Sequence, residues 1–169
     1  MPRMPRRIEH TATYACSPAA LHAALTTEEY WTARVQAVGG DAAALDSVTV
    51  AGGGIEVALT QVIAAKHLPS IISKIKSGDL EISRTESWGP LQADAATGSV
   101  TARVNGTPAR VRGASSLTGD DGSATVRTTA EATVAVPLIG GKIEQAVADN
   151  VTALLMAEQR FTQQWLAQR

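Results

Sequence analysis

Charged side chains fall on a strand-like face that should point into the protein. Residues 80–88 alternate between two faces, and the more apolar face carries Leu80, Ile82, Arg84, Glu86 and Trp88. A charge inside a fold is costly unless it is paired or hydrogen-bonded. Arg84 and Glu86 therefore predict an internal ion pair, a bulge that turns this strand end outward, or polar contacts in a mostly apolar binding cavity.

Glu158 raises the same question on a helix. It lies between Leu154 and Phe161 on an apolar stripe, about 40° from the centre of that stripe at 100° per residue. Three explanations are open. The helix leaves the sheet there and Glu158 is in water, or Glu158 pairs with an internal base such as Arg84, or Glu158 is a polar contact for a ligand.

His10 shares a strand face with Ile8 and Ala12 and is expected to face the same interior. A lone histidine on an apolar face is either a hydrogen-bonded core residue or a functional group. If the protein is an enzyme of the cyclase or dehydratase type, His10 or Glu158 is the candidate general base.

Aromatic residues make up only 4% of the chain, so each is a candidate for a specific role. Tyr14, Tyr30, Trp31 and Trp88 are predicted to pack in the core or to contact a ligand. The rest of the core must then come largely from alanine, valine, isoleucine and leucine.

Several familiar classes of site leave no signal in the sequence. Cys16 is the single cysteine, which excludes an internal disulfide and a cysteine-based zinc site. His10, His22 and His67 are scattered without metal-ligand spacing. Neither a phosphate-binding glycine loop followed by lysine nor a nucleophile elbow is found. We therefore predict no metal and no cofactor.

A basic cluster is expected from Arg103, Arg110, Arg112 and Arg127, which lie on neighbouring predicted strands. These side chains are predicted to lie on the solvent face of the sheet. An acidic partner is the alternative, but aromatic residues are not interleaved with them, as binding to nucleic acid would favour.

The composition describes one folded domain. The chain has 169 residues, 44% of them hydrophobic, with 15 basic and 16 acidic side chains. This argues against general disorder and gives no global reason to bind nucleic acid or an anionic membrane. No apolar run is long enough for a membrane span or follows the basic N-terminus as in a signal peptide. We expect a cytoplasmic protein without integral membrane association.

Hydrophobic periodicity predicts one strand, two short helices and then six strands. The first strand covers 8–14, Ser17 and Pro18 open a helix over 18–25, and a second helix runs from Glu28 to Gly39-Gly40. The further strands are expected at 47–51, 55–63, 80–88, 98–104, 109–118 and 123–136. Glycine and Asn-Gly turns join most of them as hairpins, so the sheet should be antiparallel.

Two segments flank this region with helical character. Residues 66–77, with Ile71, Ile72 and Ile75, are expected to form one or two helical turns or a mobile loop with an apolar edge. After Gly140-Gly141, a helix of roughly 28 residues carries an apolar stripe. The stripe consists of Ile143, Val147, Val151, Leu154, Phe161 and Trp165. It should lie on the sheet, and a bundle partner in a dimer is the competing explanation.

This order resembles the helix-grip fold of the START-like (SRPBCC) superfamily, which includes Bet v 1-like proteins, polyketide cyclases and lipid-transfer domains. Within it, the chain resembles the actinobacterial DUF2505 family. The resemblance is carried by Ile8-Glu9-His10, Ser17-Pro18, Glu29-Tyr30-Trp31, Trp88-Gly89-Pro90 and the run from Val136 to Glu144. It implies an α+β helix-grip fold in which a curved seven-stranded antiparallel sheet wraps a long C-terminal helix.

The sequence therefore predicts a disordered tail over 1–7 and a single START-like domain over 8–169. A curved sheet and a straight helix cannot pack flush everywhere, so a cavity should remain between them. We expect it to bind or carry a lipid-like or polyketide-like molecule, with 66–77 and the loops near Trp88 at its mouth. The candidate ligand-binding residues are His10, Tyr30, Trp31, Ile82, Arg84, Glu86, Trp88, Val151, Leu154, Glu158 and Phe161. A cyclase-like enzyme and a ligand-free interaction protein are the alternatives, and the chain is expected to be a monomer or homodimer.

Overall fold

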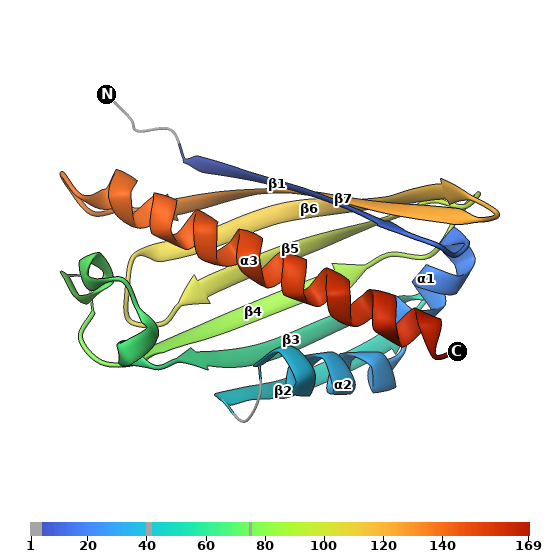
Figure 1. Cartoon of the computed structure of the whole chain (residues 1–169), viewed down its shortest axis with the longest axis horizontal. Coiled ribbons are helices and arrows are strands. Elements are labelled where there is room, and N and C mark those ends of the chain that lie inside the picture. The colour runs from blue at the N-terminus through green and yellow to red at the C-terminus, as the bar shows by residue number, and fades with distance from the viewer. Residues whose placement is uncertain (1–4, 40–41, 75) are drawn as a thin grey trace.

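An open sheet of seven antiparallel strands forms the body of the protein (Figure 1). The computed structural model describes residues 5–39, 42–74 and 76–169. The strands are β1 (Arg6–Tyr14), β2 (Ala43–Ala51), β3 (Gly54–Ile63), β4 (Leu80–Trp88), β5 (Ala96–Val104), β6 (Ala109–Asp120) and β7 (Ser123–Val134). Their spatial order is β1-β7-β6-β5-β4-β3-β2, so the predicted antiparallel seven-stranded sheet is confirmed.

Two short helices carry the chain from one edge of the sheet to the other. Helix α1 (Pro18–Leu25) begins after Ser17, whose hydroxyl accepts a hydrogen bond from the Ala20 amide at 3.2 Å. Helix α2 (Glu28–Gly39) follows, with two glutamates in its first turn, where the helix dipole favours negative charge. Because β1 and β2 are the two edge strands, α1 and α2 span the width of the sheet between them.

Tight turns then fold the remaining strands back and forth. Gly52 and Gly53 both have positive φ, 61° and 80°, and they form the two-residue connection between β2 and β3. Such left-handed positions suit glycine and match the twist of a hairpin. The register of β3 with β4 runs without a break from Ile55 opposite Trp88 to Ile63 opposite Leu80, so β4 has no bulge.

The long helix α3 (Gly140–Ala167) crosses one face of the sheet diagonally (Figure 1). We call this the inner face and the opposite one the outer face. The helix has 28 residues, as the sequence predicts. Ile143 of the predicted stripe is fully buried. The other buried side chains of α3 are those of Glu144, Ala148, Glu158 and Thr162, and their centre is rotated from the centre of the predicted stripe by roughly 60° at 100° per residue.

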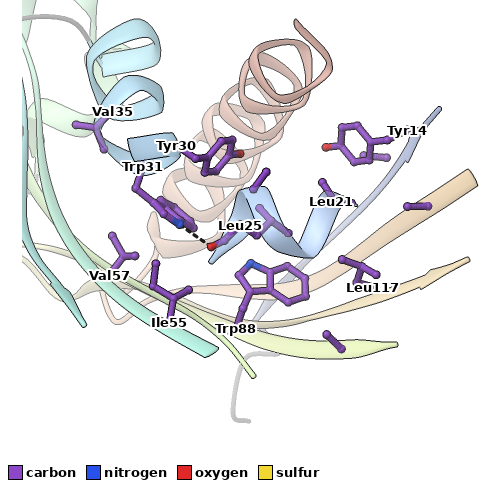
Figure 2. Close-up of a cluster of buried hydrophobic side chains, with 14 of the residues drawn as sticks. Tyr14, Leu21, Leu25, Tyr30, Trp31, Val35, Ile55, Val57, Trp88 and Leu117 are labelled. Atoms are coloured by element: carbon purple, nitrogen blue, oxygen red, sulfur yellow. Dashed lines mark hydrogen bonds between the residues drawn. The ribbon is translucent and has the colours of Figure 1, made fainter. Parts of the chain in front are cut away.

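The largest hydrophobic cluster among the described residues lies under the C-terminal part of α3, where α1 and α2 add a layer. Figure 2 shows Leu21, Leu25, Tyr30 and Trp31 of these helices packed over Trp88 and the strands. The indole nitrogen of Trp31 donates to the Leu25 carbonyl at 2.8 Å, and the Trp31 side chain is fully buried. This bond satisfies a buried polar group and fixes α2 against the end of α1.

Element boundaries differ from the predictions mainly at strand ends. β1 begins at Arg6, so Arg6 and Arg7 belong to the sheet rather than to a tail, and β2 begins at Ala43 rather than at residue 47. The segment predicted at 66–77 overlaps two short 3₁₀ helices, η2 (Ala65–His67) and η3 (Ser70–Lys74). The predictions for residues 1–4, Gly40 and Ile75 lie outside the described residues.

The predicted faces of the strands are confirmed. On β4, Leu80, Arg84, Glu86 and Trp88 are buried and Ile82 is half-buried, while the alternate side chains are more exposed. The side chains of the basic cluster, Arg103, Arg110, Arg112 and Arg127, are exposed to solvent, as expected.

Candidate functional site

A pocket of about 450 Å³ lies between the N-terminal half of α3 and the inner face of the sheet. We call it the outer pocket because it opens to solvent, although it lies on the inner face of the sheet. Most of its lining is aliphatic, with alanines and valines of β5, β6 and β7 on one side and Val147, Val151 and Leu154 of α3 on the other. The space exists because these side chains are too short to meet across the gap between helix and sheet.

The outer pocket opens to solvent beside η2. Its exposed lining residues are His67 at the end of η2, Pro69 just after it, Arg110 at the start of β6, and Asp149 and Asn150 on α3. Residues near 66–77 therefore border the opening, as predicted. Trp88 lies at the other end of β4 and is buried, so the loops beside it are not part of this opening.

A second, smaller pocket of about 90 Å³ lies deeper along α3, toward α1 and α2. We call it the inner pocket. Its lining is more polar and includes His10, Tyr30, Thr128 and Gln159. Four residues line both pockets, namely Arg84, Val100, Thr128 and Leu155. The two spaces therefore adjoin at a wall that contains one buried guanidinium and one buried hydroxyl.

Four buried charges form a closed network beside this wall. Arg84 donates to both carboxylate oxygens of Glu158, at 2.8 and 3.0 Å, and also contacts Glu86. Arg34 of α2 lies 2.7 Å from Glu158 and 3.4 Å from Glu86. All four side chains are less than 10% exposed. The network joins α2, β4 and α3, and its two positive and two negative charges balance.

The network keeps Glu158 ionised. Burial by itself raises the pKa of this carboxyl, but the charges of Arg34 and Arg84 and their hydrogen bonds lower it to about 2. The same attraction, from Glu158 and then Glu86, outweighs desolvation at Arg34 and Arg84 and raises the pKa of both guanidiniums. Each ion is thus stabilised by its neighbours in a site where it would otherwise be costly.

For one hydrogen bond beside the inner pocket, between Tyr30 and Thr162, the structure identifies the donor. The Thr162 hydroxyl donates to the Glu158 carbonyl at 2.8 Å, so it can only accept from the hydroxyl of Tyr30, 2.6 Å away. Burial raises the pKa of Tyr30, which keeps this hydroxyl protonated. Nearby, His10 Nε2 hydrogen-bonds to Oε1 of Gln159 at 2.9 Å, and the hydroxyls of Ser115 and Thr128 are 2.9 Å apart.

Comparison with known proteins identifies the family of this chain. A family model described as a protein of unknown function (DUF2505) matches residues 9–166. The chain belongs to the DUF2505 family. An uncharacterised protein of Mycobacterium tuberculosis is 34% identical to it over 170 residues, which cover 96% of this chain and 98% of the relative.

Solved structures place this DUF2505 chain in the START-like fold. A START superfamily protein from Mycobacterium smegmatis has a TM-score of 0.51 and 8% identity, covering 94% of this chain and 98% of that one. Norcoclaurine synthase from Thalictrum flavum has a TM-score of 0.54 and 13% identity, covering 97% and 87%. At this level of identity the likeness shows a shared fold, and the predicted helix-grip architecture is confirmed.

The sequence-predicted site residues of this DUF2505 chain separate into three groups. Ile82, Val151 and Leu154 line the outer pocket, and Arg84 lines both pockets. The inner pocket is lined by His10, Tyr30, Glu86, Trp88 and Glu158. Trp31 and Phe161 line neither of these two pockets; Trp31 is in the core, and Phe161 packs beside Tyr30 with ring centroids 5.8 Å apart.

Of the three explanations for Glu158, the ion pair with Arg84 is present. Glu158 also lines the inner pocket, so contact with a ligand stays a prediction. The explanation that placed Glu158 in water is wrong, because α3 stays on the sheet there and the residue is only 8% exposed. The internal ion pair expected between Arg84 and Glu86 is also present.

Arg34 is the main site residue that the sequence interpretation missed. It lies one helical turn after Tyr30, on the buried side of α2, and its guanidinium carbon is 4.5 Å from the centroid of the Trp31 ring. A signal was present in the charges: Arg84, Glu86 and Glu158 leave one negative charge unbalanced, which calls for a second buried base. Glu144 was also missed, and its carboxylate accepts from the Val134 amide at 2.8 Å.

Two further observations concern the described residues. No three histidine, cysteine, aspartate or glutamate side chains among them gather where they could share a metal ion. In the same part of the chain, no helix combines the length and the hydropathy needed to cross a membrane.

Proposed function

We propose that this protein binds and carries an apolar small molecule, lipid-like or polyketide-like, in the outer pocket. The pocket belongs to a single domain, predicted over 8–169 and extended by Arg6 and Arg7 of β1. The observation that supports this most directly is a solvent-accessible pocket of about 450 Å³ with a largely aliphatic lining. That volume is within the usual range for small-molecule sites, about 300–1,000 Å³. Ile82, Val151 and Leu154 are the proposed apolar contacts.

Burial of ligand surface supplies the driving force in this proposal. Each 100 Å² of apolar ligand surface taken out of water contributes about 2.5 kcal/mol. The pocket also offers apolar surface of its own, because Val151 and Leu154 on α3 are only half-buried without a ligand. A ligand would cover these side chains together with its own surface.

The charge network favours a carrier over an enzyme that uses Glu158 as a base. A carboxylate with a pKa of about 2, held by two guanidiniums, is a weak proton acceptor near neutral pH. Glu158, Arg84 and Glu86 are therefore proposed to shape and polarise the end of the pocket rather than to transfer protons.

The test is binding of the neutral apolar dye N-phenyl-1-naphthylamine, followed by its fluorescence. Ala102 lines the outer pocket, and Ala102→Phe should fill part of it and weaken dye binding by roughly tenfold or more. Ala114 is exposed on the outer face of β6, so Ala114→Phe is the matched control and should bind dye like the wild type. Equal affinity in all three proteins, or no dye binding by the wild type, would refute the proposal.

A further inference from the structure

The two pockets adjoin, which bears on the kind of ligand that fits. Arg84, Val100, Thr128 and Leu155 line both, so a molecule lying in the outer pocket has one end against the inner one. The inner pocket has about 90 Å³ against about 450 Å³. It has room for a terminal polar group rather than for the body of the ligand.

The buried charges near that terminal group are already paired with one another. Glu158 and Glu86 are each contacted by both Arg34 and Arg84, and these four buried charges sum to zero. A carboxylate or ammonium arriving here would be an additional buried ion without a counter-charge, which is strongly unfavourable. The other titratable groups in the inner lining are His10 and two tyrosines, Tyr14 and Tyr30. Burial raises the pKa of both tyrosines, so they stay neutral.

Neutral hydrogen-bonding capacity remains at the wall. The hydroxyls of Ser115 and Thr128 lie 2.9 Å apart, and only one of their two O–H groups can donate within that pair. The other O–H is available to donate into the pocket, and the hydroxyl oxygens keep lone pairs that can accept. Thr128 is 7% exposed and lines both pockets, so it is placed where the end of a ligand would arrive.

We propose that the inner pocket is a subsite for an uncharged hydrogen-bonding end of the ligand, an alcohol or a carbonyl, recognised by the Ser115 and Thr128 hydroxyls. This inference rests on the proposed function and narrows its ligand class. The ligand is then a neutral amphipathic molecule with one polar end, in preference to a fatty acid or an amine.

The experiment compares dodecane, dodecanol and dodecanoate as competitors of N-phenyl-1-naphthylamine. At about pH 8 dodecanoate is ionised and an ordinary histidine is neutral. Dodecanol should bind wild-type protein roughly tenfold or more tightly than dodecanoate. In Thr128→Val, dodecanol should weaken roughly fivefold while dodecane stays unchanged, because only dodecanol loses a hydrogen bond.

Thr101→Val, at an exposed threonine on β5, is the matched control and should alter neither ligand. If Thr128→Val does not fold, Ser115→Ala tests the same hydroxyl pair and should show the same selectivity. Dodecanoate binding as tightly as dodecanol, or equal effects of the variants on dodecane and dodecanol, would overturn the subsite while leaving the carrier function intact. Failure of dye and all three competitors to bind wild-type protein would instead refute the proposed function, and the subsite with it.

Discussion

The two halves of α3 lie on the same sheet but form different interiors. Under the C-terminal half, the Tyr30 ring packs 5.8 Å from Phe161 and 5.7 Å from Trp165, and α1 and α2 complete the layer. Under the N-terminal half, the facing side chains are alanine, valine, isoleucine and leucine, and the outer pocket lies among them. We call these the closed half and the open half.

The distribution of aromatic residues accounts for this difference. The chain has three tryptophans, two tyrosines and one phenylalanine, and all six belong to or pack against the hydrophobic cluster of the closed half. Each aromatic side chain fills far more volume than an alanine or valine. Aromatic side chains and the extra helices therefore fill most of the space between α3 and the sheet in the closed half, although a pocket of about 840 Å³ remains outside it, between α1 and the C-terminal end of α3. The network of Arg34, Arg84, Glu86 and Glu158 lies at the border between the halves.

The largest effect is expected at this border. Glu158→Gln leaves two buried guanidiniums with one carboxylate, and we expect a loss of about 3–5 kcal/mol in the free energy of unfolding. Chemical denaturation at neutral pH measures it. Glu56→Gln removes an exposed glutamate on β3 and is the matched control, with a change of less than about 0.5 kcal/mol.

A charge-balanced replacement sharpens the same point. The double variant Arg84→Met/Glu158→Leu removes one charge of each sign and should cost less than Glu158→Gln alone, because it leaves Arg34 opposite Glu86. A double variant less stable than the single variant would show that packing around the network, rather than charge balance, determines stability here.

Matched leucines compare the halves directly. Leu21 is fully buried in the closed half, and Leu21→Ala should cost about 3 kcal/mol by losing contacts and leaving a cavity. Leu154 faces the outer pocket and is half-buried, so Leu154→Ala should cost only about 1 kcal/mol. Urea denaturation of both variants measures the difference, and equal losses would contradict the distinction between the halves.

The charge network should lose stability in acid but not at neutral pH. The folded-state pKa of Glu158 is about 2, below its usual value of 4.5, so its stabilisation is present above about pH 4.5 and is lost as the pH falls toward 2. The loss should reach about 3 kcal/mol. Denaturation midpoints across this range measure it, and Arg84→Met/Glu158→Leu should show a shallower decline.

The smallest effect concerns one hydroxyl of the closed half. Tyr30→Phe removes the donor to Thr162 but keeps the ring contacts, so we expect a loss of about 1 kcal/mol. Thermal unfolding detects such a change. No shift in the melting temperature would mean that the phenol hydroxyl adds nothing beyond the packing of its ring.

Local periodicity was sufficient to predict the order of the helices and strands and the inward residues of each strand, and the resemblance to the START-like superfamily supplied their helix-grip arrangement. The alternation over 80–88 placed Arg84 and Glu86 inside, because a side chain's face in a strand depends only on its position along that strand. Ser17 and Pro18 likewise predicted the start of α1 to the residue, since capping is a local property.

Contacts between distant elements were harder to predict. Arg34 meets Glu86 across 52 positions of sequence, and it does so only because α2 returns over the sheet to β4. The volume of the outer pocket depends on the spacing between α3 and the sheet, which residue types alone do not determine. The apolar side of α3 was correctly predicted. In the structure, part of this side turns toward the outer pocket and α2, because the polar residues Glu144, Glu158 and Thr162, each with a hydrogen-bond partner, occupy the buried side of the helix.

The pairing of β1 with β7 has a consequence for biosynthesis. Arg6 lies opposite Ala132 and Tyr14 opposite Ala124, so the first strand finds its neighbour only after most of the chain has left the ribosome. Such distant pairing carries a large loop-closure entropy and slows folding. Pulse-labelled hydrogen exchange during refolding should show the amides of β1 and β7 gaining protection together and late. The N-terminal strand therefore lacks its native partner in the sheet until β7 has been made.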